Sequence, residues 1–396
     1  MMDGALCDET SLPEKLRKQQ VVVTTKCSPE EKRKKMELII LHQSEFPGKI
    51  RETITLAAGA SAVGSDPEDF LGCVYNRVKQ FFLGVSPGVH LSDNDDNGTS
   101  NHEWHGLDSD VDTEEQAETA VRFFPQVLRD KMETRSLHQL KTSHPVYCSL
   151  MSLKASFFIP LLAQLGTELD IFGKDERGGL TVFFRNVLVR LSLYNTLEKS
   201  WNDEQHPEKV DETFLEVLMR LKKRGLLTFQ DADHSLIWTL SQQEPRHTRA
   251  RLRFFLDWNP TSLVDTGRGT PLLYEFLRNL SIKPREKGAS YLDDKYQRFV
   301  AIFEHGMSHF PEKLGFLFYR DSFQLACRAF RFTKSAQQVL DDTLWNRILE
   351  QGDQLRFIQI LFVATASNAE ISLDGLFLIV RREPGVAMPP PSHDSF

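Results

Sequence analysis

Residues 268–277 read RGTPLLYEFL, and this stretch decides how the rest of the chain is interpreted. Gly269 eases a turn, and Thr270 and Pro271 suit the start of a helix, with Pro271 at its first position. Apolar residues follow from Leu272 onward. The stretch therefore predicts the start of a helix that packs on one side.

Segments of helical length follow one another from about residue 121 to about residue 388. Four of them carry an apolar stripe at roughly the i, i+3, i+4, i+7 spacing of a helix with one buried face. The stripes are Phe214, Val217, Leu218 and Leu221; Phe299, Ile302, Phe303 and Met307; Ala336, Val339, Leu340 and Leu344; and Leu373, Leu376, Phe377 and Val380. Strand-like alternation is largely missing from the sequence, so we predict an all-α fold.

The stripes recur at similar distances along the chain. From Phe214 through Leu252, Phe299, Val339 and Leu376 the steps are 38, 47, 40 and 37 residues. Helical repeats have periods of about 33 to 47 residues, and each repeat packs on its neighbours. We therefore expect an irregular repeat solenoid, with an ordinary helical bundle as the alternative.

Several short sequence stretches between residues 176 and 386 resemble those of a known family. The stretches are ERGGL (176–180), FLDWNPTSLV (255–264), IFEHGMSHFPEKLGFLFYRD (302–321), SFQLACRAF (322–330) and VRREPGV (380–386). In this order they resemble a family of divergent ankyrin-like repeat proteins of diatoms, over about residues 125–388. The family has no assigned activity, so the resemblance implies a fold and not a function.

The resemblance implies two copies of the ankyrin motif T-P-L-H-x-A. Its structural residues here are Gly269, Thr270, Pro271, Leu272, Phe323, Leu325 and Ala326. Neither copy keeps the motif's His, because Leu273 and Gln324 stand in its place. We therefore expect a looser and less regular stack than a consensus array forms.

The sequence ahead of the predicted repeats changes character sharply. No Lys or Arg occurs between Lys79 and Arg122, whereas ten Asp and Glu residues do. Such a segment buries too little apolar surface to offset its conformational entropy. We predict a disordered N-terminus (1–27), a helical segment (28–90) that starts with a capping box at SPEE, a disordered acidic linker (91–120), ankyrin-like repeats (121–388) and a disordered Pro-rich tail (389–396).

Composition restricts the classes of protein that fit. The formal net charge is −7 and the pI about 6.0, so we expect no nucleic-acid partner. Five cysteines are scattered without a C-x-x-C pair, and no apolar run is long enough to span a membrane. We expect a cytoplasmic protein, with the nucleus as the alternative because KRKK (32–35) resembles an import signal.

Motifs that carry chemistry are weak or incomplete. DNDDNGTSNHEW (93–104) fits the first half of a calcium-binding EF-hand loop, but Trp104 stands where a bidentate acid is required. HEWH (102–105) lacks the i, i+4 histidines of a zinc protease, and no phosphate-binding glycine motif is present. We therefore expect no catalytic residue, no cofactor site and no metal site. Weak calcium attraction to the acidic segment, or its contact with the repeats, stays open.

A basic cluster, RHTRARLR (246–253), supplies the candidate contact patch Arg246, Arg249, Arg251 and Arg253. The alternative is a solvated helix face. Because stacked helices present an extended surface, we predict a non-catalytic scaffold for an unidentified protein partner. A nuclear adaptor is the second prediction. An enzyme or small-molecule binder formed by the N-terminal segment is the third.

Overall fold

The computed structural model describes residues 28–61, 66–85, 105–136, 139–182, 185–193, 207–242, 248–267, 269–282 and 289–330. These residues are mostly helical, and their strands form two short antiparallel pairs. The prediction of an all-α class is confirmed at this level. The predictions for residues 1–27, for residues 91–104 and for everything after residue 330 lie outside the described residues.

The chain divides into two compact units. Unit 1 comprises Met1–Leu191, Thr196–Gln205 and Glu216–Leu227, and unit 2 comprises Ser192–Asn195, His206–Leu215 and Thr228–Phe396. This division differs from the predicted one, because the N-terminal helices share a unit with residues up to 191. The helix α10 (Pro207–Lys223) contributes residues to both units.

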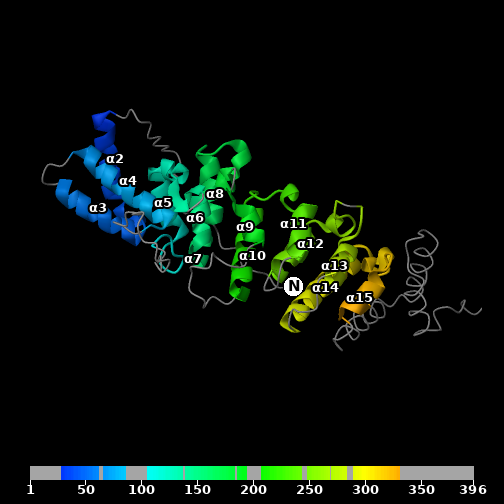
Figure 1. Ribbon diagram of the computed structural model, residues 1–396. Helices are drawn as coiled ribbons and strands as arrows, with labels where there is room; N and C mark the ends of the chain where they lie inside the picture. The colour runs from blue at the N-terminus through cyan, green and yellow to red at the C-terminus, as the bar shows by residue number, and fades with distance from the viewer. Residues whose placement is uncertain are drawn as a thin grey trace, which may run out of the picture. The chain divides into compact units, whose positions relative to one another are not determined.

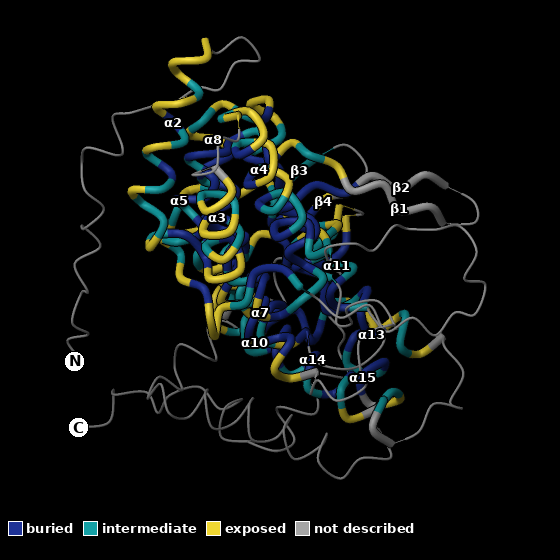
Figure 2. The backbone as a smooth tube through the Cα atoms, turned by 90° about the vertical axis from the view of Figure 1, so that its left-hand side faces the viewer, coloured by how far each residue is buried: buried dark blue, intermediate teal, exposed yellow. Residues whose placement is uncertain are grey.

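Unit 1 begins with the helices α2 (Pro29–Leu41), α3 (Gly48–Ser61) and α4 (Pro67–Leu83), with the 3-10 turn η1 (Gln43–Glu45) after α2. The predicted capping box is confirmed, because Ser28 Oγ accepts from Glu31 N at 3.3 Å and Glu31 Oε2 accepts from Ser28 N at 2.7 Å. Helix α3 is largely exposed and turns Ile50 and Ile54 into the core (Figure 2).

The predicted acidic linker is wrong for residues 105–120. Thr113 caps the helix α5 (Glu114–Phe123) through a second capping box with Gln116. Leu107 and the apolar face of α5 are buried, while Lys154 Nζ lies 2.7 Å from a carboxylate oxygen of Asp110. The segment is ordered because Leu107, Ala117 and Ala120 are buried in one core and several of its acids, Asp110 and Glu114 among them, pair with basic side chains.

The remainder of unit 1 is a succession of short helices and turns. In chain order these are η2 (Pro125–Arg129), the hairpin β1 (Met132–Ser136) and β2 (Gln139–Ser143), α6 (Pro145–Cys148), η3 (Ser149–Met151), α7 (Leu153–Ser156), α8 (Ile159–Glu168), η4 (Lys174–Gly179), the pair β3 (Thr181–Val182) and β4 (Arg185–Asn186), and α9 (Val187–Leu193). Gly178, at φ 64°, lets η4 close on α8, since a Cβ there would lie 1.8 Å from the Ala163 carbonyl oxygen.

From α10 onward the chain repeats one order: helix, 3-10 turn, helix. The elements are η5 (Phe229–Asp231), α11 (His234–Gln242), α12 (Arg249–Trp258), η6 (Pro260–Leu263), α13 (Leu272–Ile282), α14 (Ala289–His309), η7 (Pro311–Phe316) and α15 (Ser322–Phe330). In unit 2, α12 packs against α14 and α13 packs against α15 (Figure 1). The predicted stripes of α10 and α14 face the core; Met307, at the end of the second, is half-buried.

Candidate functional site: arginines and tyrosines on neighbouring helices

The first motif copy begins a helix, as expected. Gly269 has φ 71° and donates its N–H to Asp265 Oδ1 at 2.9 Å, and α13 starts at Leu272. The Thr270 hydroxyl donates to Glu275 Oε1 at 3.0 Å. Glu275, in the place of the motif's small residue, is 2% exposed. A small residue at this place in the motif permits two helices to approach closely. Here the place is filled by the buried Glu275 side chain, which is hydrogen-bonded to Thr270.

The second motif copy begins α15 at Ser322. Leu325 and Ala326 are buried, and the Phe323 ring stacks on Phe318 with centroids 5.6 Å apart. Since α13 and α15 pack together, the two motif copies belong to neighbouring helices (Figure 1). All seven motif residues thus serve packing and turns.

Tyrosine and arginine side chains meet where these two helices begin. The rings of Tyr274 and Tyr319 meet edge to face, with centroids 5.5 Å apart. The Arg320 guanidinium carbon lies 5.7 Å from the Tyr274 centroid and 5.1 Å from the Tyr319 centroid. Sequence reasoning missed this cluster, although Tyr274 lies inside the motif copy and Tyr319 precedes the other by three residues.

The predicted basic patch is divided by burial. Arg251 is fully buried, and its Nε lies 2.6 Å from Asp211 Oδ1. Its Nη1 donates to the Ser192 carbonyl at 3.2 Å, at the end of α9, and its guanidinium lies over the Phe214 ring. Burial lowers the pKa of Arg251, and the Asp211 carboxylate opposes that shift. Arg251 therefore holds helices together and is not on the surface; Arg246 lies outside the described residues.

Arg298 on α14 repeats the bond to a distant carbonyl, although its carboxylate partner lies on its own helix. It is fully buried, its Nε lies 2.9 Å from Asp294 Oδ2, and its Nη1 donates to the Leu240 carbonyl near the end of α11. Arg251 and Arg298 lie 59 and 58 residues after the carbonyls that they reach. Each arginine directly precedes an apolar stripe, in R-L-R-F-F-L and R-F-V-A-I-F. The same pattern does not separate buried from exposed arginines, because Arg253 also precedes apolar residues and is exposed.

The outward faces of α12 and α14 are joined by polar pairs. Arg249 and Arg253, the other described members of the basic patch, are exposed. The pairs are Arg249 Nη1 to Gln297 Oε1 at 3.0 Å, Arg253 Nη2 to Glu304 Oε2 at 3.7 Å, and His305 Nε2 to Asp257 Oδ1 at 2.9 Å. The first and last pairs each span 48 residues, so α12 and α14 run parallel in constant register.

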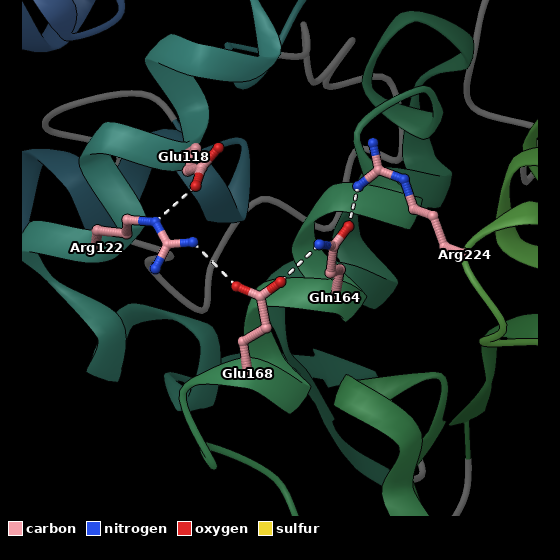
Figure 3. Close-up of polar contacts among 5 residues, drawn as sticks. All are labelled: Glu118, Arg122, Gln164, Glu168 and Arg224. Atoms are coloured by element: carbon pink, nitrogen blue, oxygen red, sulfur yellow. Dashed lines mark hydrogen bonds and ion pairs between the residues drawn. The ribbon is translucent and has the colours of Figure 1, made fainter. Parts of the chain in front are cut away.

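Unit 1 contains a more exposed polar chain (Figure 3). Arg122 on α5 bonds Glu118 Oε1 at 2.6 Å and Glu168 Oε2 of α8 at 3.0 Å. Gln164 donates to Glu168 at 2.6 Å and accepts from Arg224, which directly follows α10, at 2.6 Å. The chain therefore links three helices of unit 1 through partly solvated groups.

Two other titratable groups of unit 1 have shifted pKa values. Burial raises the pKa of Tyr75, whose hydroxyl donates to Asp130 Oδ2 at 2.6 Å, and this carboxylate raises it further. Burial also raises the pKa of Asp112, although the Asp108 N–H and Lys49 oppose the shift. Tyr75 remains a hydrogen-bond donor at neutral pH, so its role is to join α4 to the end of η2.

The basic run KRKK lies on α2 and is partly used in packing. Lys35 is 6% exposed, with Nζ 4.6 Å from the centroid of the Phe124 ring, and Lys32 Nζ lies 2.7 Å from Glu68 Oε2. Within the described ranges, no three His, Cys, Asp or Glu residues are placed to hold a metal ion. The helices of these ranges also include none with the length and apolarity of a membrane span.

Comparisons with known proteins found no match. No protein-family model, no curated protein and no solved structure matches this chain. The resemblance to diatom ankyrin-like proteins therefore remains a prediction, and the functional argument depends on geometry.

Proposed function

We propose that this protein is a non-catalytic scaffold for protein–protein interaction, built on irregular ankyrin-like helical repeats and acting in the cytoplasm. One observation carries the proposal: two buried arginines, Arg251 and Arg298, each donate to a backbone carbonyl of an earlier helix, at sequence separations of 59 and 58 residues. Such translational order is typical of a stacked array and unusual in a closed bundle. An array buries its core between neighbours and leaves an extended surface for partners.

The parallel register of α12 and α14 supports the same interpretation. In a stack, first helices of successive repeats run in one direction, and a constant offset follows from repeat length. Two of the three polar pairs between α12 and α14 share one offset of 48 residues, Arg249 with Gln297 and Asp257 with His305. In the described ranges these polar groups bond across helices and do not converge on one point. This arrangement favours a binding role over catalysis.

The nuclear adaptor is less well supported than the cytoplasmic scaffold. An import receptor must reach the basic side chains of a signal. Lys35 is buried on Phe124 and Lys32 pairs with Glu68, so the folded KRKK run offers fewer accessible cations than its sequence indicates.

Affinity capture followed by reconstitution tests the scaffold. The full chain, immobilised through its C-terminus, should retain a saturable partner from a homogenate of its own organism. That partner, purified, should form a complex of fixed stoichiometry with the full chain in sedimentation velocity. A matched variant, Arg251→Met, should lose the partner if the array must be intact. Failure to reconstitute any complex from purified components would overturn the proposal.

A further inference from the structure

Helices α13 and α15 present a surface that we name the arginine–tyrosine face. Its members are Tyr274 and Arg278 on α13, Tyr319 and Arg320 ahead of α15, and Arg328 on α15. Arg278 follows Tyr274 by one helical turn on α13, Arg320 lies two residues before α15, and Arg328 lies in the last turn of α15. Tyr274 and Tyr319 are half-buried, whereas all three arginines are exposed. Tyrosine and arginine are the residues that most often dominate binding energy at protein interfaces.

Arg320 is held in place before any partner arrives. Its backbone has φ 48°, a left-handed conformation that is uncommon for a residue with a side chain. Its guanidinium lies over two tyrosine rings, which restrict the side chain through cation–π contact. A preordered arginine loses less conformational entropy on binding than a freely rotating one. Backbone strain at an exposed residue is common at binding sites, so this geometry indicates a ligand-facing role.

The charge of the face is opposite to that of the whole protein. The chain has a formal net charge of −7. Among the described residues of α13, α15 and the two residues before α15, three arginines are exposed, at positions 278, 320 and 328. The same residues include one exposed acid, Asp321. Glu275 pairs with Arg278 at 3.3 Å, but its side chain is 3% exposed and so contributes little charge at the surface. Arg328 forms no ion pair within the described residues.

We propose that the arginine–tyrosine face binds an acidic peptide segment, rich in Asp and Glu, of a partner protein. The planar guanidinium groups match carboxylates in two-bond geometry, and the tyrosine rings supply apolar contact beneath them. The inference rests on the proposed scaffold function, since it names the partner chemistry for one surface of the array. A short carboxylate-rich peptide fits better than a nucleic acid, because it can be confined to this one basic face, whereas a long phosphate backbone would extend over the rest of a chain whose net charge is −7.

Fluorescence anisotropy with a labelled deca-glutamate peptide tests the face directly in the full chain at low salt. The double variant Arg320→Ala/Arg328→Ala should weaken binding about tenfold, from two charge-assisted contacts of roughly 0.7 kcal/mol each. Arg320→Lys keeps the charge but loses the planar stack, and it should weaken binding by a smaller factor. The matched control Arg253→Ala removes an exposed arginine from α12 and should change the affinity less than twofold.

Two further probes separate the possible outcomes. A deca-glutamine peptide should not bind, and a short DNA duplex should bind more weakly than deca-glutamate. Three results would each overturn the acidic-peptide proposal. Deca-glutamate could bind the double variant as tightly as the wild type, it could fail to bind the wild type, or the DNA duplex could bind the wild type more tightly than deca-glutamate does. If the double variant still forms a complex with the captured partner, the scaffold function is supported and the arginine–tyrosine face is not its binding site.

Discussion

The two units use arginine across helices in opposite ways. In unit 1, Arg122 and Arg224 join helices through carboxylates and an amide that remain partly solvated (Figure 3). In unit 2, Arg251 and Arg298 make bonds of the same kind with no exposed surface. Water screens the first set, whereas the second set has exchanged water for protein partners. Similar geometry should therefore have very different consequences for stability.

Loss of Arg251 should have the largest effect. Arg251→Met leaves the Asp211 carboxylate buried without its cation, which should destabilise the fold by about 3–5 kcal/mol. Urea unfolding followed by circular dichroism measures the change. Arg253→Met on the same helix is the matched control and should cost less than about 0.5 kcal/mol.

A double substitution sharpens the same test. In Asp211→Leu/Arg251→Met neither charge is buried, so much of the lost stability should return. A double variant that is as unstable as both single losses combined would show that Arg251 acts through packing rather than through its charge pair.

Loss of Arg298 should have a smaller effect than loss of Arg251. Its carboxylate partner, Asp294, has an 18% exposed side chain and can be hydrated when the arginine is removed. We expect Arg298→Met to cost about 2–3 kcal/mol, measured by the same urea unfolding. If Arg298→Met costs more than Arg251→Met, the solvent exposure of the acid does not control the penalty.

The exposed chain of Figure 3 should contribute little and should respond to salt. Arg122→Ala should cost no more than about 1 kcal/mol at low ionic strength and less at about 1 M salt, where charges are screened within about 3 Å. Thermal unfolding at both ionic strengths measures it. A cost above about 3 kcal/mol that salt does not change would remove the contrast between the two units.

The smallest effect is expected at Asp112. Burial raises its pKa above 3.8 in the folded state, so its protonated form is the better accommodated one. Its stabilising contribution is present at low pH and is lost as pH rises through the raised pKa. Wild type should therefore gain stability relative to Asp112→Asn as pH falls from neutral through the raised pKa toward the ordinary range of an aspartate. A difference between the two proteins that does not depend on pH over this window contradicts the assignment.

Local signals in the sequence predicted local structure well. The capping box at Ser28 and the turn before Pro271 formed as expected, because each depends on residues within one helical turn. The stripes on α10 and α14 predicted which side faces the core. These features need no knowledge of distant partners.

Features that depend on distant partners were predicted poorly. Residues 105–120 resembled a linker, since their acids outnumber their apolar residues, yet Lys154 and the core of unit 1 order them. Arg251 resembled a surface cation because a charge pattern does not reveal Asp211, 40 residues earlier. The tyrosine cluster required two segments, at Tyr274 and Tyr319, to meet.

Helix α10 has a consequence for any attempt to divide the gene. Its first half contains Asp211, the partner of Arg251 in unit 2, and its last turn contains Arg220, the partner of Glu114 in unit 1. A fragment that ends before Pro207 lacks a cation of unit 1, and one that begins after Lys223 lacks an anion of unit 2. A cut at either end of α10 therefore leaves one fragment without an ion-pair partner. We expect recombination and proteolytic cleavage to be less well tolerated at α10 than at other boundaries in the chain.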